Sequence, residues 1–224
     1  MIDTNLIFPT PVWVEDNAGI DREKLLEFVN FVRKEDPEGR EISNNGGWQS
    51  HDFTDEVMLK NPLFELRNKI LQMAYYCADE FGFVDYTLRI VNLWMNVNTR
   101  GNSNHVHTHP GSILSGVYYV SVPDCCSGTL NFLRDYQYQM MKESWGMGNN
   151  VKHDSTLNEN IVTFSPENDS MVMFPAWLLH SVSKSNSDGE RISISFNVQV
   201  FSNYYHEIYP SRQLAGQNLS LKIV

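Results

Sequence analysis

The sequence predicts a mainly β protein with flanking helices, an α+β fold whose strands form a sandwich or a closed barrel. Helical periodicity occurs twice, both times in the first half of the 224 residues. From Tyr86 onward the pattern changes to short strands separated by Gly, Pro, Asn or Asp. Such a series of short strands is typical of sandwiches and barrels. Each helix has one apolar face, so we expect the two helices to cover the β part.

The first predicted helix spans residues 21–36, DREKLLEFVNFVRKED. Asp21 has a side chain suited to capping the helix N-terminus. The apolar residues on one face are Leu25, Phe28, Val29 and Val32.

The second predicted helix lies within residues 61–83, NPLFELRNKILQMAYYCADEFGF. Asn61 is the expected cap, and Pro62 occupies the first helical position, where its missing N–H is harmless. Apolar residues recur every three or four positions: Leu63, Leu66, Ile70, Met73, Cys77 and Phe81.

Six strands are expected after the helices, at 86–98, 113–122, 128–133, 160–165, 170–175 and 191–201. The segment 134–160 interrupts this series. Long irregular insertions of this kind are often lids or specificity loops, and a solvent-exposed hairpin is an equal alternative.

The last strand has strict alternation, which leaves two interpretations open. Its apolar residues point one way, and Arg191, Ser193, Ser195, Asn197 and Gln199 point the other. In the first interpretation the polar face lies in water. In the second, the helices cover the apolar face, and the polar face looks into a barrel that holds a polar ligand.

Length and composition indicate one globular domain over residues 1–224, with 42% hydrophobic and 12% aromatic residues. Within it we expect a helical N-terminal support at about 20–82, a β core at about 86–201 and a C-terminal extension at 202–224. The extension has aromatic and aliphatic residues that suit packing on the sheet or on another subunit, so a homodimer is one hypothesis.

Charge and cysteine content restrict the partners and the compartment. The net charge is −10 and no Lys/Arg cluster occurs, so nucleic acid is an unfavourable partner. No signal peptide or membrane span is expected, and Cys77, Cys125 and Cys126 fit neither a disulfide framework nor a zinc site. We therefore expect free thiols and a cytoplasmic protein.

Three of the seven histidines lie at alternate positions in NHVHTHPGS, residues 104–112. Imidazole is a common metal ligand, and alternate residues of a strand share a face, so His107 and His109 could approach one ion. His180, just past a buried strand, is the expected third ligand. By itself a His-x-His pair is more often a surface feature than a metal site. His105 is expected to lie outside the ligand set.

Polar residues on the neighbouring strands suit a dicarboxylate. The guanidinium of Arg191 can bind a carboxylate through two hydrogen bonds, and the Ser193 hydroxyl can add another. Upstream, Asn96 and Asn98 could orient the near carboxylate of a keto acid. A surface arginine and serine are the alternative. Trp94 and Trp177 flank the candidate metal strands, and a place in the core is expected for both.

Together these motifs give the chain a family resemblance. The order Asn-x-Asn, Gly, His-x-His, a strand, a second strand ending before His180 and then Arg-x-Ser resembles that of the iron(II)- and 2-oxoglutarate-dependent oxygenases. More narrowly, LIFPTPVW, HTHPGSILSGVYYVSVP, MVMFPAWLLHSV and RISISFNV are similar to a subfamily known mainly from bacteria and phages. The resemblance implies a double-stranded β-helix, a cupin-like jelly roll with helices on its outer face.

The resemblance also implies roles for the residues above. His107 matches the first metal histidine and His180 the distal one, and Arg191 with Ser193 matches the anchor for the far carboxylate of 2-oxoglutarate. One departure is clear, because His109 occupies the position where most of the superfamily has Asp or Glu. The site thus carries one negative charge fewer, and we expect weaker affinity for iron(II).

The implied reaction is a dioxygenase reaction that consumes 2-oxoglutarate and O2, yields succinate and carbon dioxide, and hydroxylates a small molecule or a protein side chain. Two alternatives remain open from the sequence. One is a cupin-like protein whose three histidines bind a metal without a keto acid. The other is a noncatalytic jelly-roll protein with a structural or binding role.

Overall fold

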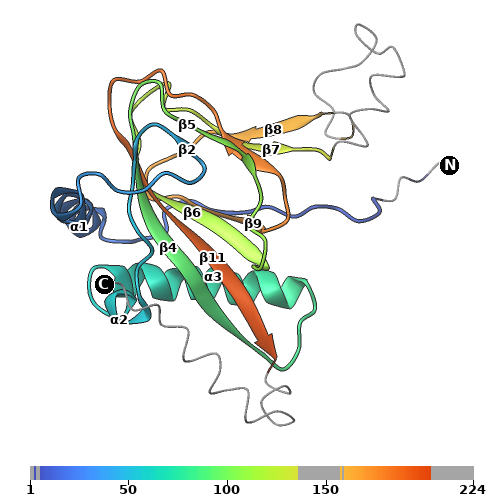
Figure 1. Cartoon of the computed structure of the whole chain (residues 1–224). Helices are drawn as coiled ribbons and strands as arrows, with labels where there is room; N and C mark the ends of the chain where they lie inside the picture. The colour runs from blue at the N-terminus through green and yellow to red at the C-terminus, as the bar shows by residue number, and fades with distance from the viewer. Residues whose placement is uncertain (1–2, 4–5, 136–156, 158, 203–224) are drawn as a thin grey trace, which may run out of the picture.

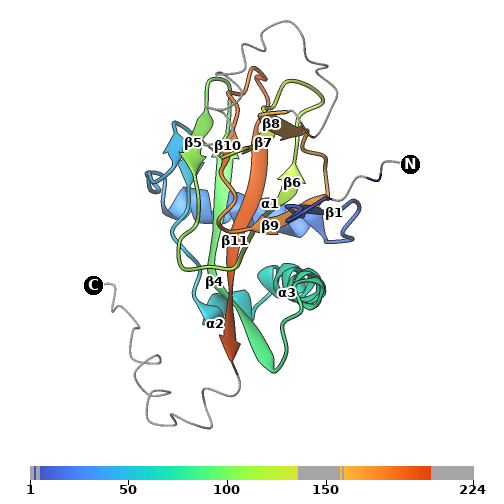
Figure 2. The same cartoon turned by 90° about the vertical axis from the view of Figure 1, so that its right-hand side faces the viewer.

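Two antiparallel β-sheets face each other, and helices cover the outer face of the larger one (Figures 1 and 2). The computed structural model describes residues 3, 6–135, 157 and 159–202. In both views the strands of the smaller sheet lie towards the top and helices α2 and α3 towards the bottom. The fold is the predicted jelly roll.

The larger sheet has the strand order β1-β9-β6-β11-β4-β3, and the smaller sheet has the order β2-β5-β10-β7-β8. The strands of the larger sheet are β1 (Trp13–Glu15), β9 (Met171–Pro175), β6 (Leu114–Ser121), β11 (Arg191–Ser202), β4 (Tyr86–Asn98) and β3 (Trp48–Gln49). Those of the smaller sheet are β2 (Asn44–Asn45), β5 (Ser103–His107), β10 (His180–Val182), β7 (Leu130–Leu133) and β8 (Ile161–Phe164). The helices are α1 (Arg22–Glu35), α2 (Asp55–Met58) and α3 (Leu63–Glu80).

The first helix forms as predicted, since the side chain of Asp21 accepts a hydrogen bond from the Lys24 N–H at its N-terminus. The cap of the second was predicted wrongly. α3 begins at Leu63, Pro62 is its N-cap residue, and no side chain caps it. Proline is thus one position outside the helix rather than its first residue, and the helix is held by the burial of its apolar face.

The alternation of β11 follows the second interpretation. Ile192, Ile194 and Phe196 lie in a core that includes the buried faces of α1 and α3. Arg191 and Ser193 are also buried, on the opposite face of the strand, between the two sheets. Helices therefore cover the apolar face, and the polar face is enclosed inside the protein.

A second apolar cluster fills part of the space between the sheets. It contains Val117, Tyr119, Leu130, Phe132, Val172, Phe174 and Leu178. β6 is buried on both faces because its even-numbered residues contact the helical layer and its odd-numbered residues contact the smaller sheet. The remaining space between the sheets is polar and holds the site described below.

Several short elements were not predicted. These are β1, β2, β3, β10 and α2. Trp177 was expected in the core but is 63% exposed, because it lies in the turn that connects β9 to β10. The extension at 203–224 and most of the insertion, residues 136–156 and 158, lie outside the described residues.

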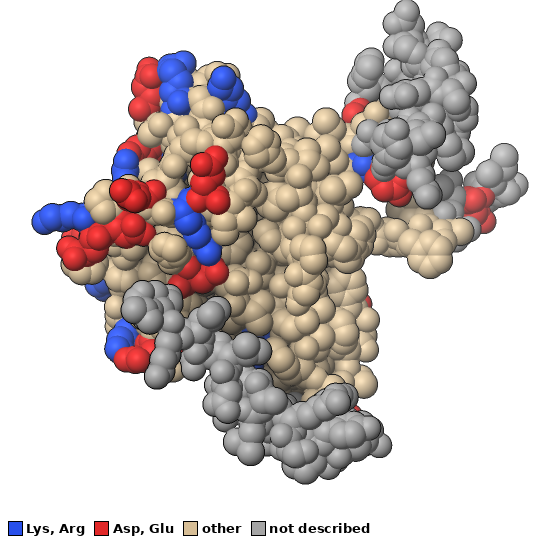
Figure 3. Space-filling view, in the orientation of Figure 1, with Lys and Arg blue, Asp and Glu red and all other residues tan. Residues whose placement is uncertain are grey.

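Among the helices that the structure describes, none is both long and apolar enough to span a membrane. On the face shown in Figure 3, charged side chains gather towards the side of α1, where both signs are mixed.

Gly116 in β6 provides a test of the packing under the helices. A Cβ atom at this position would lie 2.4 Å from Cζ of Phe196 and 2.7 Å from the carbonyl oxygen of Val172. We expect Gly116→Ala to lower the free energy of unfolding by about 1–3 kcal/mol through overpacking, measured by urea denaturation. Gly189→Ala is the control, since its nearest neighbour is the Pro123 ring at 3.1 Å, and equal losses in both variants would contradict the packing.

Candidate metal centre

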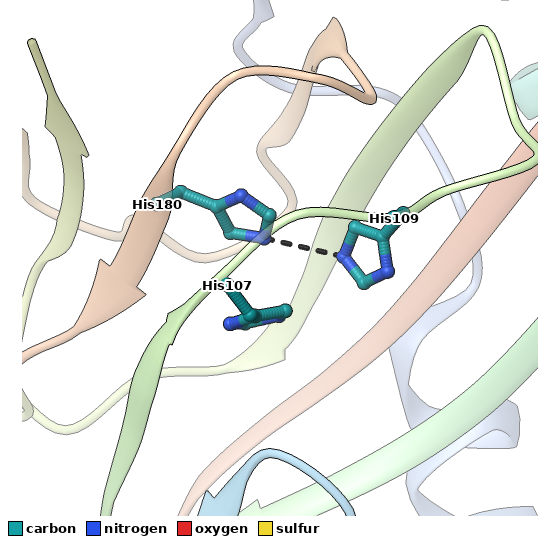
Figure 4. A group of neighbouring side chains, drawn as sticks. All are labelled: His107, His109 and His180. Atoms are coloured by element: carbon teal, nitrogen blue, oxygen red, sulfur yellow. Dashed lines mark hydrogen bonds between the residues drawn. The ribbon is translucent and has the colours of Figure 1, made fainter. Parts of the chain in front are cut away.

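Three imidazoles from two distant parts of the chain, residues 107–109 and residue 180, meet between the sheets (Figure 4). One ring nitrogen from each of His107, His109 and His180 lies within 4.8 Å of the other two. Nε2 of His109 and Nε2 of His180 are 3.2 Å apart. Two nitrogens that each lie about 2.1 Å from one ion at a right angle are separated by about 3 Å, so this spacing suits a shared metal ion.

The smaller sheet positions two of these histidines directly. His107 ends β5 and His180 begins β10, and they are paired residues of the antiparallel ladder. Side chains of paired residues lie on the same face, which brings the ring centroids to 4.3 Å.

His109 reaches the site by a different route from the one predicted. The sequence suggested that His107 and His109 share a strand face, but β5 ends at His107. The backbone N–H of His109 instead donates a 2.9 Å hydrogen bond to the carbonyl of Ala176, in the turn before His180. A loop anchored on this turn therefore supplies the third ligand.

Backbone carbonyls fix the orientation of two rings. Nδ1 of His107 donates to the carbonyl of His105 at 2.7 Å, and Nδ1 of His180 donates to the carbonyl of Leu178 at 2.8 Å. A carbonyl can only accept, so in the neutral rings Nε2 keeps its lone pair for a metal. In this arrangement Nε2 of His109 donates to His180, and an ion between the rings would replace that proton.

Burial keeps the three rings neutral at pH 7. It lowers the pKa of His180 to about 3 and that of His109 to about 4, and His107 adds to both shifts because like charges repel. Burial also lowers the pKa of His107. Neutral imidazoles are the form that coordinates a cation.

His105 lies outside this group, as expected. Its side chain is exposed, and it contributes through its backbone. Its N–H donates to the carbonyl of Ser43 at 2.9 Å, while its own carbonyl accepts the His107 proton.

A cavity of about 60 Å³ extends from the histidines towards the start of β11. A single water molecule needs about 10–15 Å³ of such space, so the cavity has room for several non-hydrogen atoms. All seven of the predicted site residues line it: Asn96, Asn98, His107, His109, His180, Arg191 and Ser193.

Arg191 is a buried cation that lacks a carboxylate partner. Its side chain is 3% exposed, and Nη1 donates to the carbonyl of Ser127 at 2.9 Å. Nε is buried without a hydrogen-bond partner, and no described Asp or Glu lies within ion-pair distance. Burial lowers its pKa from the ordinary value because the charge is poorly solvated. An anion in the cavity would supply the missing partner.

The register of β4 and β11 arranges the polar residues in a row. Asn98 lies opposite Arg191, and Asn96 lies opposite Ser193. The next inward-facing pair is Trp94 with Ser195, and the Trp94 ring centroid lies 5.9 Å from that of His109. The row therefore runs from the guanidinium to the histidines over four residues of strand, roughly 14 Å at about 3.4 Å per residue.

Tyr119 is a cavity residue that the sequence analysis missed. It is buried, and its burial raises the pKa of the hydroxyl to about 12, an effect that the Arg191 charge partly opposes. The hydroxyl is therefore protonated at pH 7 and can donate to an anion beside Arg191.

A wider groove of about 420 Å³ adjoins the cavity and shares Ser43, Trp94, His107 and His109 with it. Arg40 and Asp52 form an ion pair in its wall, with Nη2 and Oδ1 2.8 Å apart. Nε of Arg40 and Oε1 of Gln49 are buried there without a hydrogen-bond partner among the described residues. The groove thus has charged and polar side chains in its wall beside His107 and His109.

The residues fit a metal ion chelated by a dicarboxylic keto acid. Three ligands on one side of an ion leave its other positions open, and an orphaned guanidinium lies at the far end of the same cavity.

Comparison with known proteins agrees with this geometry. Residues 92–197 match the family model described as "Putative 2OG-Fe(II) oxygenase". This segment contains all of the predicted site residues. No curated protein matches the sequence significantly.

Solved structures share the fold at low sequence identity. One is the viral collagen prolyl hydroxylase of Paramecium Bursaria Chlorella virus-1 with 2OG, at 13% identity and TM-score 0.51, covering 84% of this chain and 94% of that one. HygX from Streptomyces hygroscopicus with nickel and 2-oxoglutarate has 11% identity and TM-score 0.55, covering 85% and 82%. A Pseudomonas putida prolyl-4-hydroxylase has 11% identity and TM-score 0.54, covering 85% and 92%.

The predicted family and the predicted cofactors, iron(II) with 2-oxoglutarate as cosubstrate, agree with these matches. Residues 92–197, which contain the three histidines and the buried arginine, are thus similar to the 2OG-Fe(II) oxygenase family.

Proposed function

We propose that this protein is an iron(II)- and 2-oxoglutarate-dependent dioxygenase of the hydroxylase type. The observation that carries the proposal is the placement of Arg191, a buried and unpaired guanidinium in the same cavity as three converging imidazoles. When bound, iron and 2-oxoglutarate would supply the oxidation, in which O2 is consumed and succinate and carbon dioxide are released.

His107, His109 and His180 would hold the iron from one side. The carbonyls of His105 and Leu178 keep two of the rings in the required tautomer. Because all three ligands are neutral, the ion keeps its full positive charge for binding the near carboxylate of the keto acid.

Arg191 would bind the distal carboxylate of 2-oxoglutarate through Nε and its Nη groups, with Ser193 and Tyr119 donating from the same walls. The register favours a change in one assignment. Asn98 was expected at the near carboxylate, but it lies opposite Arg191 and so belongs with the distal one. Asn96, one pair closer to the histidines, is held by a 3.1 Å hydrogen bond to Ser195.

The groove beside His107 and His109 would receive the oxidised molecule. It opens next to the metal ligands, and Trp94 forms part of both spaces. Arg40, Gln49 and Asp52, which line the groove, would hydrogen-bond a polar small molecule or a protein side chain. The cytoplasmic location and the homodimer stay predictions.

The two alternatives fit Arg191 less well. A cupin-like metalloprotein without a keto acid has no use for a buried guanidinium aimed into the metal cavity, because an unpaired buried charge costs folding free energy. A noncatalytic jelly roll has the same difficulty.

The proposal is tested by incubating the full chain with iron(II), 2-oxoglutarate and O2 and measuring succinate. We expect slow, iron-dependent succinate formation even without the second substrate, and none when iron is omitted. Absence of succinate under conditions in which both ligands demonstrably bind would refute the enzymatic proposal.

His109 provides a prediction about the unusual ligand set. Removing one of three ligands in His109→Ala should weaken metal binding by more than the about 10- to 100-fold typical of losing an outer hydrogen-bond partner. His105→Ala is the control and should bind normally, since its imidazole is exposed. His109→Asp should retain iron(II) binding because a carboxylate restores the common ligand set. Calorimetric titration measures all three, and loss of binding in His109→Asp would mean that the geometry accepts only imidazole.

A further inference from the structure

Two adjacent cysteines lie in the turn between β6 and β7, beside the loop that precedes Arg191. Cys125 and Cys126 are both exposed, whereas Cys77 is on the buried face of α3. Cys125 and Cys126 are neighbours in the chain, so their Cα atoms are about 3.8 Å apart. The pair therefore forms an accessible dithiol.

The backbone of this turn connects the dithiol to the cavity. The Cys126 carbonyl accepts hydrogen bonds from the N–H groups of Asn186 at 2.8 Å and Ser187 at 3.1 Å. The next carbonyl, that of Ser127, accepts the hydrogen bond from Nη1 of Arg191. This hydrogen bond holds the Arg191 guanidinium in position.

The turn is packed closely enough to transmit a backbone change. A Cβ at Gly128 would lie 3.1 Å from Nη1 of Arg191 and 2.4 Å from the carbonyl oxygen of Ser183. The backbone at 127–128 therefore forms part of the wall around the guanidinium, and a shift there moves a contact of Arg191.

Closing a disulfide would change the backbone of Cys126. Its φ is 63°, in the left-handed region that a non-glycine residue seldom adopts. A disulfide between neighbours forms a ring that includes the N–Cα bond of the second cysteine, and adjacent Cα atoms are about 3.8 Å apart, closer than the usual 4.4–6.8 Å. Such a disulfide is strained and exposed, which makes it easily reduced again.

The surroundings support oxidation at this pair. Both thiols of the pair are exposed, so a peroxide can reach either one. Burial raises the pKa of the Cys77 thiol to about 12, so this thiol stays protonated at pH 7. The two exposed thiols are therefore expected to react before the buried one.

We propose that Cys125 and Cys126 are a reversible modification site for hydroperoxides, and that their oxidation to a vicinal disulfide weakens anion binding at Arg191. One thiolate attacks the peroxide, whose O–O bond breaks, giving a sulfenic acid and an alcohol, or water when the peroxide is hydrogen peroxide. The second thiol displaces the hydroxyl of the sulfenic acid as water, so the dithiol loses two electrons and two protons and the peroxide is reduced. The effect on 2-oxoglutarate rests on the proposed function, whereas the modification itself does not.

The test uses the full chain loaded with nickel(II), to avoid iron-driven oxidation, before and after one equivalent of hydrogen peroxide. We expect the thiol count of the unfolded protein to fall from three to one without a covalent dimer, and dithiothreitol to restore it. Affinity for 2-oxoglutarate should fall about tenfold on oxidation, and metal affinity should not change. Cys125→Ser and Cys126→Ser are the matched controls and should keep their affinity for 2-oxoglutarate.

Hydrogen exchange of the Asn186 and Ser187 amides gives a readout that needs no 2-oxoglutarate. Both should exchange faster in the oxidised protein, while the His105 amide, bonded to Ser43, stays unchanged. Intermolecular disulfides, or a vicinal disulfide with unchanged exchange and affinity, would overturn the proposal. If the reduced protein fails to bind 2-oxoglutarate, the proposed function fails. The thiol count and the amide exchange still show in that case whether the disulfide forms and whether it changes the backbone.

Discussion

Replacing Arg191 with methionine is expected to weaken 2-oxoglutarate binding by about 30- to 5,000-fold, the equivalent of about 2–5 kcal/mol for truncating one partner of a buried charge pair. Metal binding should be unaffected, because Arg191 lies at the opposite end of the polar row from the histidines. The free energy of unfolding of the ligand-free protein should stay the same or rise, since a buried guanidinium without a carboxylate partner is removed.

Calorimetric titrations with 2-oxoglutarate and with metal, combined with urea denaturation, measure these three quantities for Arg191→Met. Arg67→Met is the matched control, because Arg67 lies on α3 away from the cavity and should change none of them. Equal losses of metal and 2-oxoglutarate binding would mean that Arg191 supports the whole site rather than the distal carboxylate.

Replacing His180 with alanine is expected to weaken metal binding by more than about 100-fold, beyond the range for losing an outer hydrogen-bond partner. His180 is the most buried of the three ligands, 4% exposed, and its ring packs against Phe174 at a centroid distance of 4.7 Å. β10 holds it directly opposite His107, and no fourth histidine of the described residues belongs to the group.

His180→Gln accompanies this variant, since glutamine preserves more of the side-chain volume and separates loss of a ligand from loss of packing. His51→Ala, at an exposed histidine outside the ligand group, is the control. Metal titration with a folding check by circular dichroism measures the effect. Full metal occupancy in a folded His180→Ala protein would exclude His180 as a ligand.

Long elements with a regular pattern were predictable from the sequence, and short ones were not. The 13-residue strand β4 was predicted with its observed bounds, because β-branched and aromatic residues recur along its whole length. β2 and β3 have two residues each, too few to show a period, and they form because a partner strand offers hydrogen bonds. Neither strand could therefore be predicted from its own residues.

Site residues divide in the same way. His107, His180 and Arg191 are marked by residue type and by their position at strand ends. Tyr119 is not, because it follows Tyr118 within a strand buried on both faces. The Tyr118 hydroxyl donates to Asp169 at 2.7 Å, and Tyr119 lines the cavity. Which tyrosine faces the ligand depends on which face the helices cover, and only the tertiary structure decides that.

Anaerobic addition of iron(II) and then 2-oxoglutarate to the full chain, followed by visible absorption spectroscopy, tests the central claim most directly. If the three imidazoles hold one ion and the guanidinium receives the other end of the same diacid, a charge-transfer band of the chelated keto acid will appear with one equivalent of each. It will be absent in His180→Ala and will need far more 2-oxoglutarate in Arg191→Met. A folded, iron-loaded protein that shows no band at saturating 2-oxoglutarate would contradict the shared site.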